Sequence, residues 1–122
     1  MFQSIEEKKI KHFDKYIDHV EIGEPAILKR RKHLIVTSPV EDVLQGTTGY
    51  AIITDNSVYI HSTKDLPEKT GKFDGVGINP VIGCPAYIQS GKDILRTSDV
   101  QDVMLGRDTV AIMTKNTMYI SC

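Results

Sequence analysis

Residues 22–62 read IGEPAILKRRKHLIVTSPVEDVLQGTTGYAIITDNSVYIHS, and residues 82–122 read IGCPAYIQSGKDILRTSDVQDVMLGRDTVAIMTKNTMYISC. The two stretches align without a gap, from Ile22 on Ile82 to Ser62 on Cys122, and 17 of the 41 aligned positions are identical. Unrelated segments of this length would share only a few identities, so the chain contains an internal duplication. A residue kept in both copies is most simply required by the fold, whereas a residue found in one copy is a candidate for function.

The composition limits the class of protein. The chain has 122 residues, enough for one ordinary domain or two very small ones that share a core. With 15 basic and 16 acidic residues the formal net charge is −1, which gives no overall field for nucleic acid or anionic lipid and argues against a DNA mimic. No apolar run approaches the ~20 residues of a membrane span, the N-terminus lacks the order of a secretion signal, and two cysteines imply no disulfide framework. We therefore expect a cytoplasmic protein with no membrane partner.

The N-terminal segment has a helical pattern. Ser4 and Glu7 have the spacing of a capping box. Apolar residues follow at intervals of three and four, namely Ile10, Phe13, Ile17 and Val20. We predict an amphipathic helix over residues 4–20. It either docks on the rest of the fold or presents Ile10, Phe13 and Ile17 to a partner or to a second copy in a homodimer.

Each copy has the pattern of short strands joined by tight turns. Apolar and polar residues alternate, and we place Tyr50 and Ile52 on the same face as Val58 and Ile60. In the second copy we predict strands over 86–89, 93–97, 100–105, 109–114 and 117–122. Matching turns contain Gly46, Gly106, Asn56 and Asn116, which we expect to adopt backbone angles that other residues resist.

The predicted fold is mainly β, a tandem duplication of a small SH3-like or OB-like meander unit. One unit alone is too short for a comfortable core, so the units should pack together with pseudo-two-fold symmetry. The predicted organisation is a helix (1–21), β unit 1 (22–62), a connector rich in Gly and Pro (63–81) and β unit 2 (82–122), with 22–122 forming one compact domain.

Three strings occur in the same order in both copies. In the first copy they are Gly23-Glu24-Pro25, Thr37-Ser38-Pro39-Val40 and Thr54-Asp55-Asn56-Ser57-Val58-Tyr59. The pattern Gly-x-Pro, Thr-Ser-x-Val and Thr-x-Asn-(Ser/Thr)-x-Tyr resembles a β module of short bacterial or phage proteins. The resemblance covers about two thirds of the chain and implies no activity.

A basic run distinguishes the first copy. Lys29, Arg30, Arg31, Lys32 and His33 stand where the second copy has Gln-Ser-Gly-Lys-Asp. At a hairpin tip this run is either a solvated turn that keeps the sheet edge from aggregating or a site for phosphates or an acidic protein surface.

Stacking aromatic residues are the second requirement of nucleic-acid binding. Tyr50 and Tyr87 each occur in only one copy and are candidates for an exposed contact.

Nothing in the sequence indicates catalysis. Thr37, Thr54 and Asp42 recur at the matching positions of the second copy, as expected of side chains that satisfy backbone groups. Paired Asp42 and Asp102 could in principle share a proton across a symmetry axis, but no second acid supports such a site. The histidines lack metal spacing and no phosphate-binding glycine loop is present.

We therefore expect no enzyme activity, no cofactor and no metal. The expected function is a non-catalytic protein-binding or regulatory module, an adaptor or inhibitor, that uses the helix, the basic tip and the groove between the units. A small nucleic-acid or nucleotide-binding protein that uses the tip at 29–33 is the alternative.

Overall fold

The N-terminal segment forms strands. The computed structural model describes residues 8–16, 19–76 and 79–121, and every regular element in those ranges is a β-strand. Strands β1 (Lys9–His12) and β2 (Lys15–Tyr16) lie where we predicted the helix, so that prediction was wrong. The physical reason is a non-local pairing: β1 runs parallel to a distant strand, β7 (Ser57–Ser62), with Lys9 opposite Ser57.

The duplication extends further than residues 22–62 and 82–122. Continued toward the N-terminus, the same alignment places strand β8 (Lys69–Lys72) on β1 and strand β9 (Gly75–Val76) on β2. The predicted connector is therefore the opening part of the second copy, and the expectation that this segment is a linker was wrong. The other strands of the first copy are β3 (Pro25–Arg30), β4 (His33–Pro39), β5 (Asp42–Gln45) and β6 (Gly49–Ile53). Those of the second copy are β10 (Pro85–Ser90), β11 (Asp93–Leu105), β12 (Val110–Thr114) and β13 (Thr117–Ser121).

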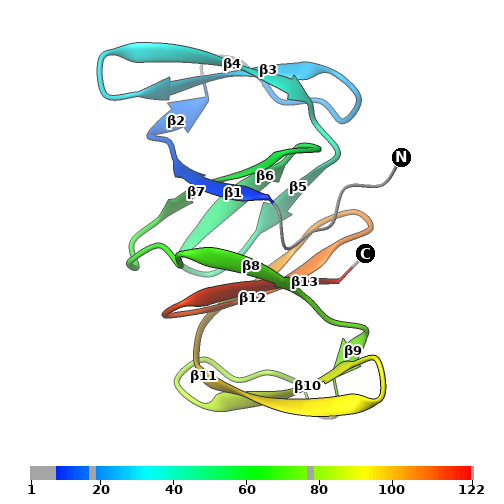
Figure 1. Ribbon diagram of the computed structural model, residues 1–122. Coiled ribbons are helices and arrows are strands. Elements are labelled where there is room, and N and C mark those ends of the chain that lie inside the picture. The colour runs from blue at the N-terminus through cyan, green and yellow to red at the C-terminus, as the bar shows by residue number, and fades with distance from the viewer. Residues whose placement is uncertain (1–7, 17–18, 77–78, 122) are drawn as a thin grey trace.

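The strands are stacked in layers (Figure 1). A barrel-like sheet runs in the order β1-β7-β6-β5-β11-β12-β13-β8, and the two copies join where Gln45 of β5 pairs with Leu105 of β11. Strands β2, β3 and β4 form a separate sheet at one end, and β9 and β10 with the first half of β11 form the matching layer at the other end.

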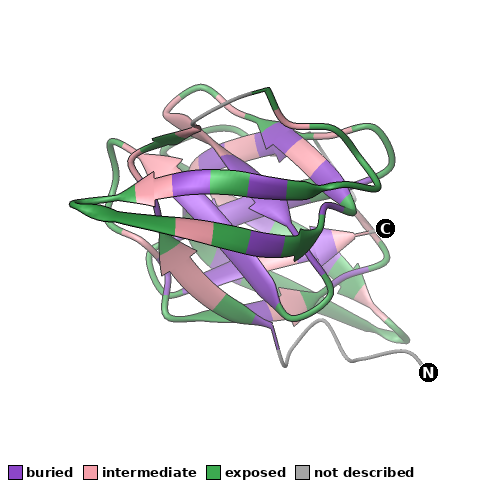
Figure 2. Ribbon diagram, turned by 90° about the horizontal axis from the view of Figure 1, so that it is seen from above, coloured by how far each residue is buried: buried purple, intermediate pink, exposed green. Residues whose placement is uncertain are grey.

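Apolar side chains fill the spaces between these layers. The central cluster takes residues from both copies, among them Leu44 and Ile60 from the first and Met104 and Ile120 from the second. Two outer clusters each belong to one copy, one around Phe13 and the other around Phe73. Burial alternates along the strands, and the hairpin tips are exposed (Figure 2).

We expected Ile52 and Val58 to lie on the same face of the central sheet, but the pairing is shifted by one residue. Ile52 pairs with Tyr59 and Ile53 with Val58. Ile52 therefore packs in the cluster around Phe13, and Val58 in the central cluster. Both faces of these strands are buried, so the alternation alone could not show which residues share a face.

Threonines kept in both copies satisfy backbone groups. The Thr37 hydroxyl accepts a hydrogen bond from the Ala26 N–H at 2.9 Å, and Thr97 does the same for Ala86. Thr54 and Thr114 donate to carbonyl groups across the two β-turns at 3.2 and 2.9 Å. Thr37 and Thr97 thus connect neighbouring strands, and Thr54 and Thr114 close the turns.

The asparagines in these turns do not have the predicted backbone conformation. Among the described residues Arg31 is the one non-glycine with a positive φ, so Asn56 and Asn116 do not adopt left-handed angles. The main-chain carbonyl groups at these two positions accept hydrogen bonds from the N–H groups of Lys9 at 2.9 Å and Glu68 at 3.0 Å. The turns therefore anchor β1 and β8.

Asp42 and Asp102 connect the two copies reciprocally. The Asp42 carboxylate accepts hydrogen bonds from the N–H groups of Arg107 and Asp108, both at 3.0 Å. Asp102 accepts from Thr47 at 2.9 Å and from Thr48 at 2.8 Å. Each carboxylate thus holds a turn of the other copy.

The glycines of these turns make room for the carboxylates. A Cβ at Gly46 would lie 2.5 Å from the Asp102 carboxylate, and a Cβ at Gly106 would lie 2.6 Å from that of Asp42. Neither glycine has a positive φ. Close approach, and not the predicted backbone freedom, explains why both copies have glycine here.

Candidate binding site on the first repeat

The basic run forms the tip of the β3–β4 hairpin, and Asp14 makes two hydrogen bonds to its main chain. The Asp14 N–H donates to the Lys29 carbonyl at 2.7 Å, and its carboxylate accepts from the Arg31 N–H. In the second copy Asp74 makes the same two contacts, with Gln89 and Gly91. The scaffold is shared, so the fold of the hairpin does not depend on the basic side chains.

Arg31 stands in a backbone conformation that favours glycine. Its φ is 57°, and its counterpart Gly91 has a φ of 63°. A left-handed conformation costs a non-glycine residue roughly 1–2 kcal/mol. The first copy therefore has an arginine where the turn itself would be served better by glycine. Such an outlier is a reason to look for a function at this position.

The tip forms a concave surface with His12 of β1. This concavity has a volume of about 550 Å³ and is lined by His12, Arg30, Arg31, Lys32 and His33. The His12 Nε2 atom lies 3.7 Å from a carboxylate oxygen of Asp14. Lys29 lies on β3 opposite Leu34. The concavity thus brings together four of the five predicted residues, Arg30 to His33, and adds His12, which we missed because we had placed it on a helix.

The hairpin also exposes apolar side chains. Strand β4 pairs with β3 on one side and is the last strand of its sheet. Leu34 is 65% exposed and Val36 is 70% exposed, and Ile27 stands opposite Val36 on the same outer face. An exposed, unpaired apolar edge is a surface to which another strand can add. We call Ile27, Leu34 and Val36 the outer face of the hairpin.

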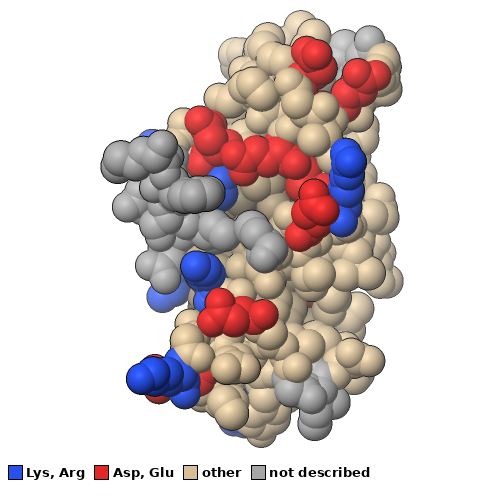
Figure 3. Space-filling model, turned by 90° about the vertical axis from the view of Figure 1, so that its right-hand side faces the viewer, with Lys and Arg blue, Asp and Glu red and all other residues tan. Residues whose placement is uncertain are grey.

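The face of the molecule away from the basic tip carries a group of acidic side chains. The β3–β4 tip lies at the left in Figure 1, and Figure 3 views the right-hand side, where acidic side chains gather over the upper half. An approaching acidic group would be drawn toward the tip.

Tyr50 belongs to an aromatic cluster. Its ring centroid lies 5.0 Å from those of Tyr16 and His61 and 5.5 Å from that of Phe13. Burial, and to a smaller extent the neighbouring Tyr50, raise the pKa of Tyr16 to about 12. Burial also raises the pKa of Tyr50. These rings pack on one another, whereas Tyr87 is 48% exposed on β10, so the structure does not bring the two predicted tyrosines together.

The residues expected to form a partner-binding helix face have other positions. Phe13 is fully buried at the centre of its cluster, and Ile10 packs against the central cluster. Ile17 lies outside the described residues. Ile10 and Phe13 are therefore part of the interior.

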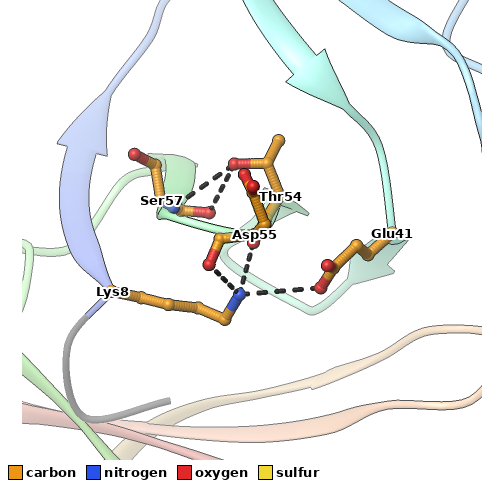
Figure 4. Close-up of polar contacts among 5 residues, drawn as sticks. All are labelled: Lys8, Glu41, Thr54, Asp55 and Ser57. Carbon is orange, nitrogen blue, oxygen red and sulfur yellow. Dashed lines mark hydrogen bonds and ion pairs between the residues drawn. The ribbon is translucent and has the colours of Figure 1, made fainter. Parts of the chain in front are cut away.

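Lys8 holds a turn of the first copy. Its ammonium group donates to the carbonyl groups of Thr54 and of Asp55, the latter at 2.8 Å, and lies 3.6 Å from the Glu41 carboxylate (Figure 4). The second copy has Glu68 in place of Lys8. These contacts of Lys8 occur only in the first copy, but the Lys8 side chain is almost fully buried, so we assign it a structural role.

The described residues offer no metal site and no carboxylate pair. They contain no group of three or more potential His, Cys, Asp or Glu ligands. Asp42 and Asp102 each accept several N–H groups of the other copy, so they do not form the proton-sharing pair we considered. Among the described residues no helix is long and apolar enough to cross a membrane.

No family model, no curated protein and no solved structure matches the chain.

Proposed function

We propose that the protein is a non-catalytic protein-binding module whose first repeat receives an extended, acidic segment of a protein partner. The β4 edge would take the segment as an added strand, and the basic tip would bind its acidic residues. This proposal rests on one observation: an exposed apolar edge strand leads directly into a cluster of cationic side chains.

Two parts of our sequence-based proposal are changed. The helix is removed because strands occupy that segment. The groove between the units is not part of the present proposal, because apolar side chains of both copies and the reciprocal Asp42 and Asp102 contacts occupy the junction between the units. The hairpin of the first repeat remains as the binding surface.

The apolar outer face favours a protein partner over nucleic acid. Binding of phosphates needs cations and stacking rings, and it does not need Leu34 and Val36 to be exposed. Added strands, in contrast, gain affinity from main-chain hydrogen bonds and specificity from alternate side chains. An acidic strand with apolar residues at alternate positions matches both features of the hairpin.

The test is an NMR titration of the labelled protein with a peptide of alternating valine and glutamate. We expect amide shifts confined to residues 27–38 and an affinity that falls as salt rises. The matched control replaces the tip by its own second-copy residues, Arg30→Ser, Arg31→Gly and His33→Asp, on a scaffold that both copies share. This variant should bind at least tenfold more weakly. Absence of shifts on β4, or equal binding by the control, would refute the proposal.

A nucleotide or nucleic-acid ligand is the second candidate, favoured by the all-basic lining of the concavity with His12. Its test is an oligothymidylate titration at low salt. Binding with a steep salt dependence, lost in the tip variant and not weakened by Val36→Arg, which adds a cation to β4, would favour this candidate. The second copy has Arg96 at the position that matches Val36, so the fold accommodates arginine there.

A further inference from the structure

The second copy contains an apolar cavity where the first copy has aromatic side chains. The cavity has a volume of about 460 Å³. Phe73 and Ile112 are buried at its base, and Val76 and Val110 line it at 40% and 37% exposure. Ser121 and Asn79 also line it and are polar. None of the described lining residues carries a charge.

The first copy shows what fits at this place in the fold. Phe13 corresponds to Phe73, and around it lie Tyr16, Tyr50 and His61, with ring centroids 5.6, 5.5 and 6.1 Å from that of Phe13. At the matching positions of the second copy, the three surrounding rings are replaced by Val76, Val110 and Ser121. Both copies have the same arrangement of strands, and the second copy has a cavity where the first has these rings.

We propose that this cavity is a binding site for a small neutral molecule with a planar aromatic ring and one hydroxyl group. The ring would pack against Phe73 as Tyr50 packs against Phe13, because aromatic pairs prefer tilted or edge-on contact at such separations. Ser121 and Asn79 provide polar atoms for the hydroxyl. Apolar cavities of about 150 Å³ already bind benzene in a folded protein, so this larger cavity has room for a substituted ring.

This proposal is independent of the hairpin proposal, since the cavity and the basic tip belong to different copies. Either one can fail without affecting the other. The cavity lies within the typical size range of small-molecule sites, roughly 300–1,000 Å³, and it has their usual composition of apolar walls with a few polar groups.

The probe is p-cresol, which is the side chain of tyrosine as a free molecule. Titration into the methyl-labelled protein should produce ring-current shifts in the methyl groups of Val76, Val110 and Ile112. Cyclohexanol, a similar molecule without the aromatic ring, should bind several-fold more weakly. No shift at millimolar p-cresol, or equal binding of cyclohexanol, would overturn the proposal.

The duplication supplies two matched variants. Val110→Tyr with Ser121→His copies the first repeat into the cavity and should abolish p-cresol binding. Tyr50→Val with His61→Ser copies the second repeat into the first and should raise the stoichiometry from one site to two. Persistent binding in the filled variant would show that p-cresol binds elsewhere and would overturn the assignment, even if the second variant does not fold.

Discussion

Replacing Asp42 by alanine removes a carboxylate that accepts three backbone hydrogen bonds. Two of them come from the second copy, from Arg107 and Asp108 at 3.0 Å, and the third comes from Val43 at 2.8 Å. A hydrogen bond to a charged group contributes about 1.5–3 kcal/mol. Arg107 and Asp108 are exposed, so water can partly replace the carboxylate. The two bonds from the second copy would together contribute about 3–6 kcal/mol, and we expect the free energy of unfolding to fall by about 3 kcal/mol, the lower end of that range.

Urea unfolding measures this loss. With a slope of about 2 kcal/mol per molar urea, the midpoint should fall by about 1.5 M. Asp99→Ala is the control, because Asp99 is an exposed aspartate on β11. A surface substitution of this kind should change stability by less than about 0.5 kcal/mol. Equal midpoints for the two variants would show that the carboxylate of Asp42 does not hold the turn.

Amide hydrogen exchange locates the effect. In Asp42→Ala the lost protection should appear at Arg107 and Asp108 in the second copy. In Asp102→Ala it should appear at Thr47 and Thr48 in the first copy. Loss of protection confined to the mutated copy would contradict the reciprocal contacts.

The pH dependence of stability provides an independent check. Burial alone would raise the pKa of Asp42, but hydrogen bonds from the backbone of Arg107 and Asp108, the hydroxyl of Thr109 and the backbone of Val43 outweigh it and lower the pKa. A carboxyl group with a lowered pKa in the folded state stabilises the fold fully above its unfolded pKa, near 3.8. That stabilisation is lost as the pH falls through the folded pKa. The difference between wild type and Asp42→Ala should therefore be constant near neutrality and shrink below about pH 4.

Three further outcomes are expected. Lys8→Ala removes a buried ammonium group from two turn carbonyls and should lower the free energy of unfolding by about 1–3 kcal/mol in urea melts, whereas Lys9→Ala, at an exposed position, should have little effect. Gly106→Ala places a Cβ against the carboxylate that holds its turn and should cost about 1–3 kcal/mol by calorimetry, whereas Gly75→Ala, which meets open space, should not. Tyr16, with its pKa raised to about 12, should remain protonated at pH 11 in an absorbance titration, and its contribution to stability should be present below pH 10 and lost as the pH rises toward 12.

The hairpins are predictable from the sequence because their turns are local. The pairs β6–β7 and β12–β13 lie where alternation and turn residues place them, and the strands predicted over 93–97 and 100–105 are confirmed within β11. The polar residues shared by both copies, such as Thr54 and Thr114, were interpreted as fold requirements, and their hydrogen bonds agree with that interpretation.

The N-terminal strands are not predictable in the same way, because their partners are far away in the chain. Strand β1 is stabilised by β7, the last strand of the same copy, and the spacing of Ile10 and Phe13 happens to match a helix. One signal was available: Phe13-Asp14 recurs as Phe73-Asp74, in the same alignment that relates Ile22 to Ile82. A helix in one copy and a linker in the other is inconsistent with that identity, so extending the alignment would have corrected both predictions.

The candidate site was partly predictable. The five residues of the tip stand together because they are consecutive, and the comparison between copies singled them out. His12 and the exposed β4 edge depend on the sheet order, which a single sequence does not show. The cavity in the second copy could not be predicted, because the sequence does not show that Tyr16, Tyr50 and His61 surround Phe13 in the first copy.

Arg31 is the position where divergence between the copies conflicts most clearly with stability. Both turns have the same left-handed geometry, and one copy uses glycine, which adopts it freely. The other keeps an arginine at a cost of roughly 1–2 kcal/mol, between Arg30 and Lys32, whose like charges add repulsion. A solvated turn that only prevents edge aggregation could use lysine or glutamate at neighbouring positions without this strain. The proposed binding function would give this strained arginine a role, as a guanidinium group that contacts the acidic segment.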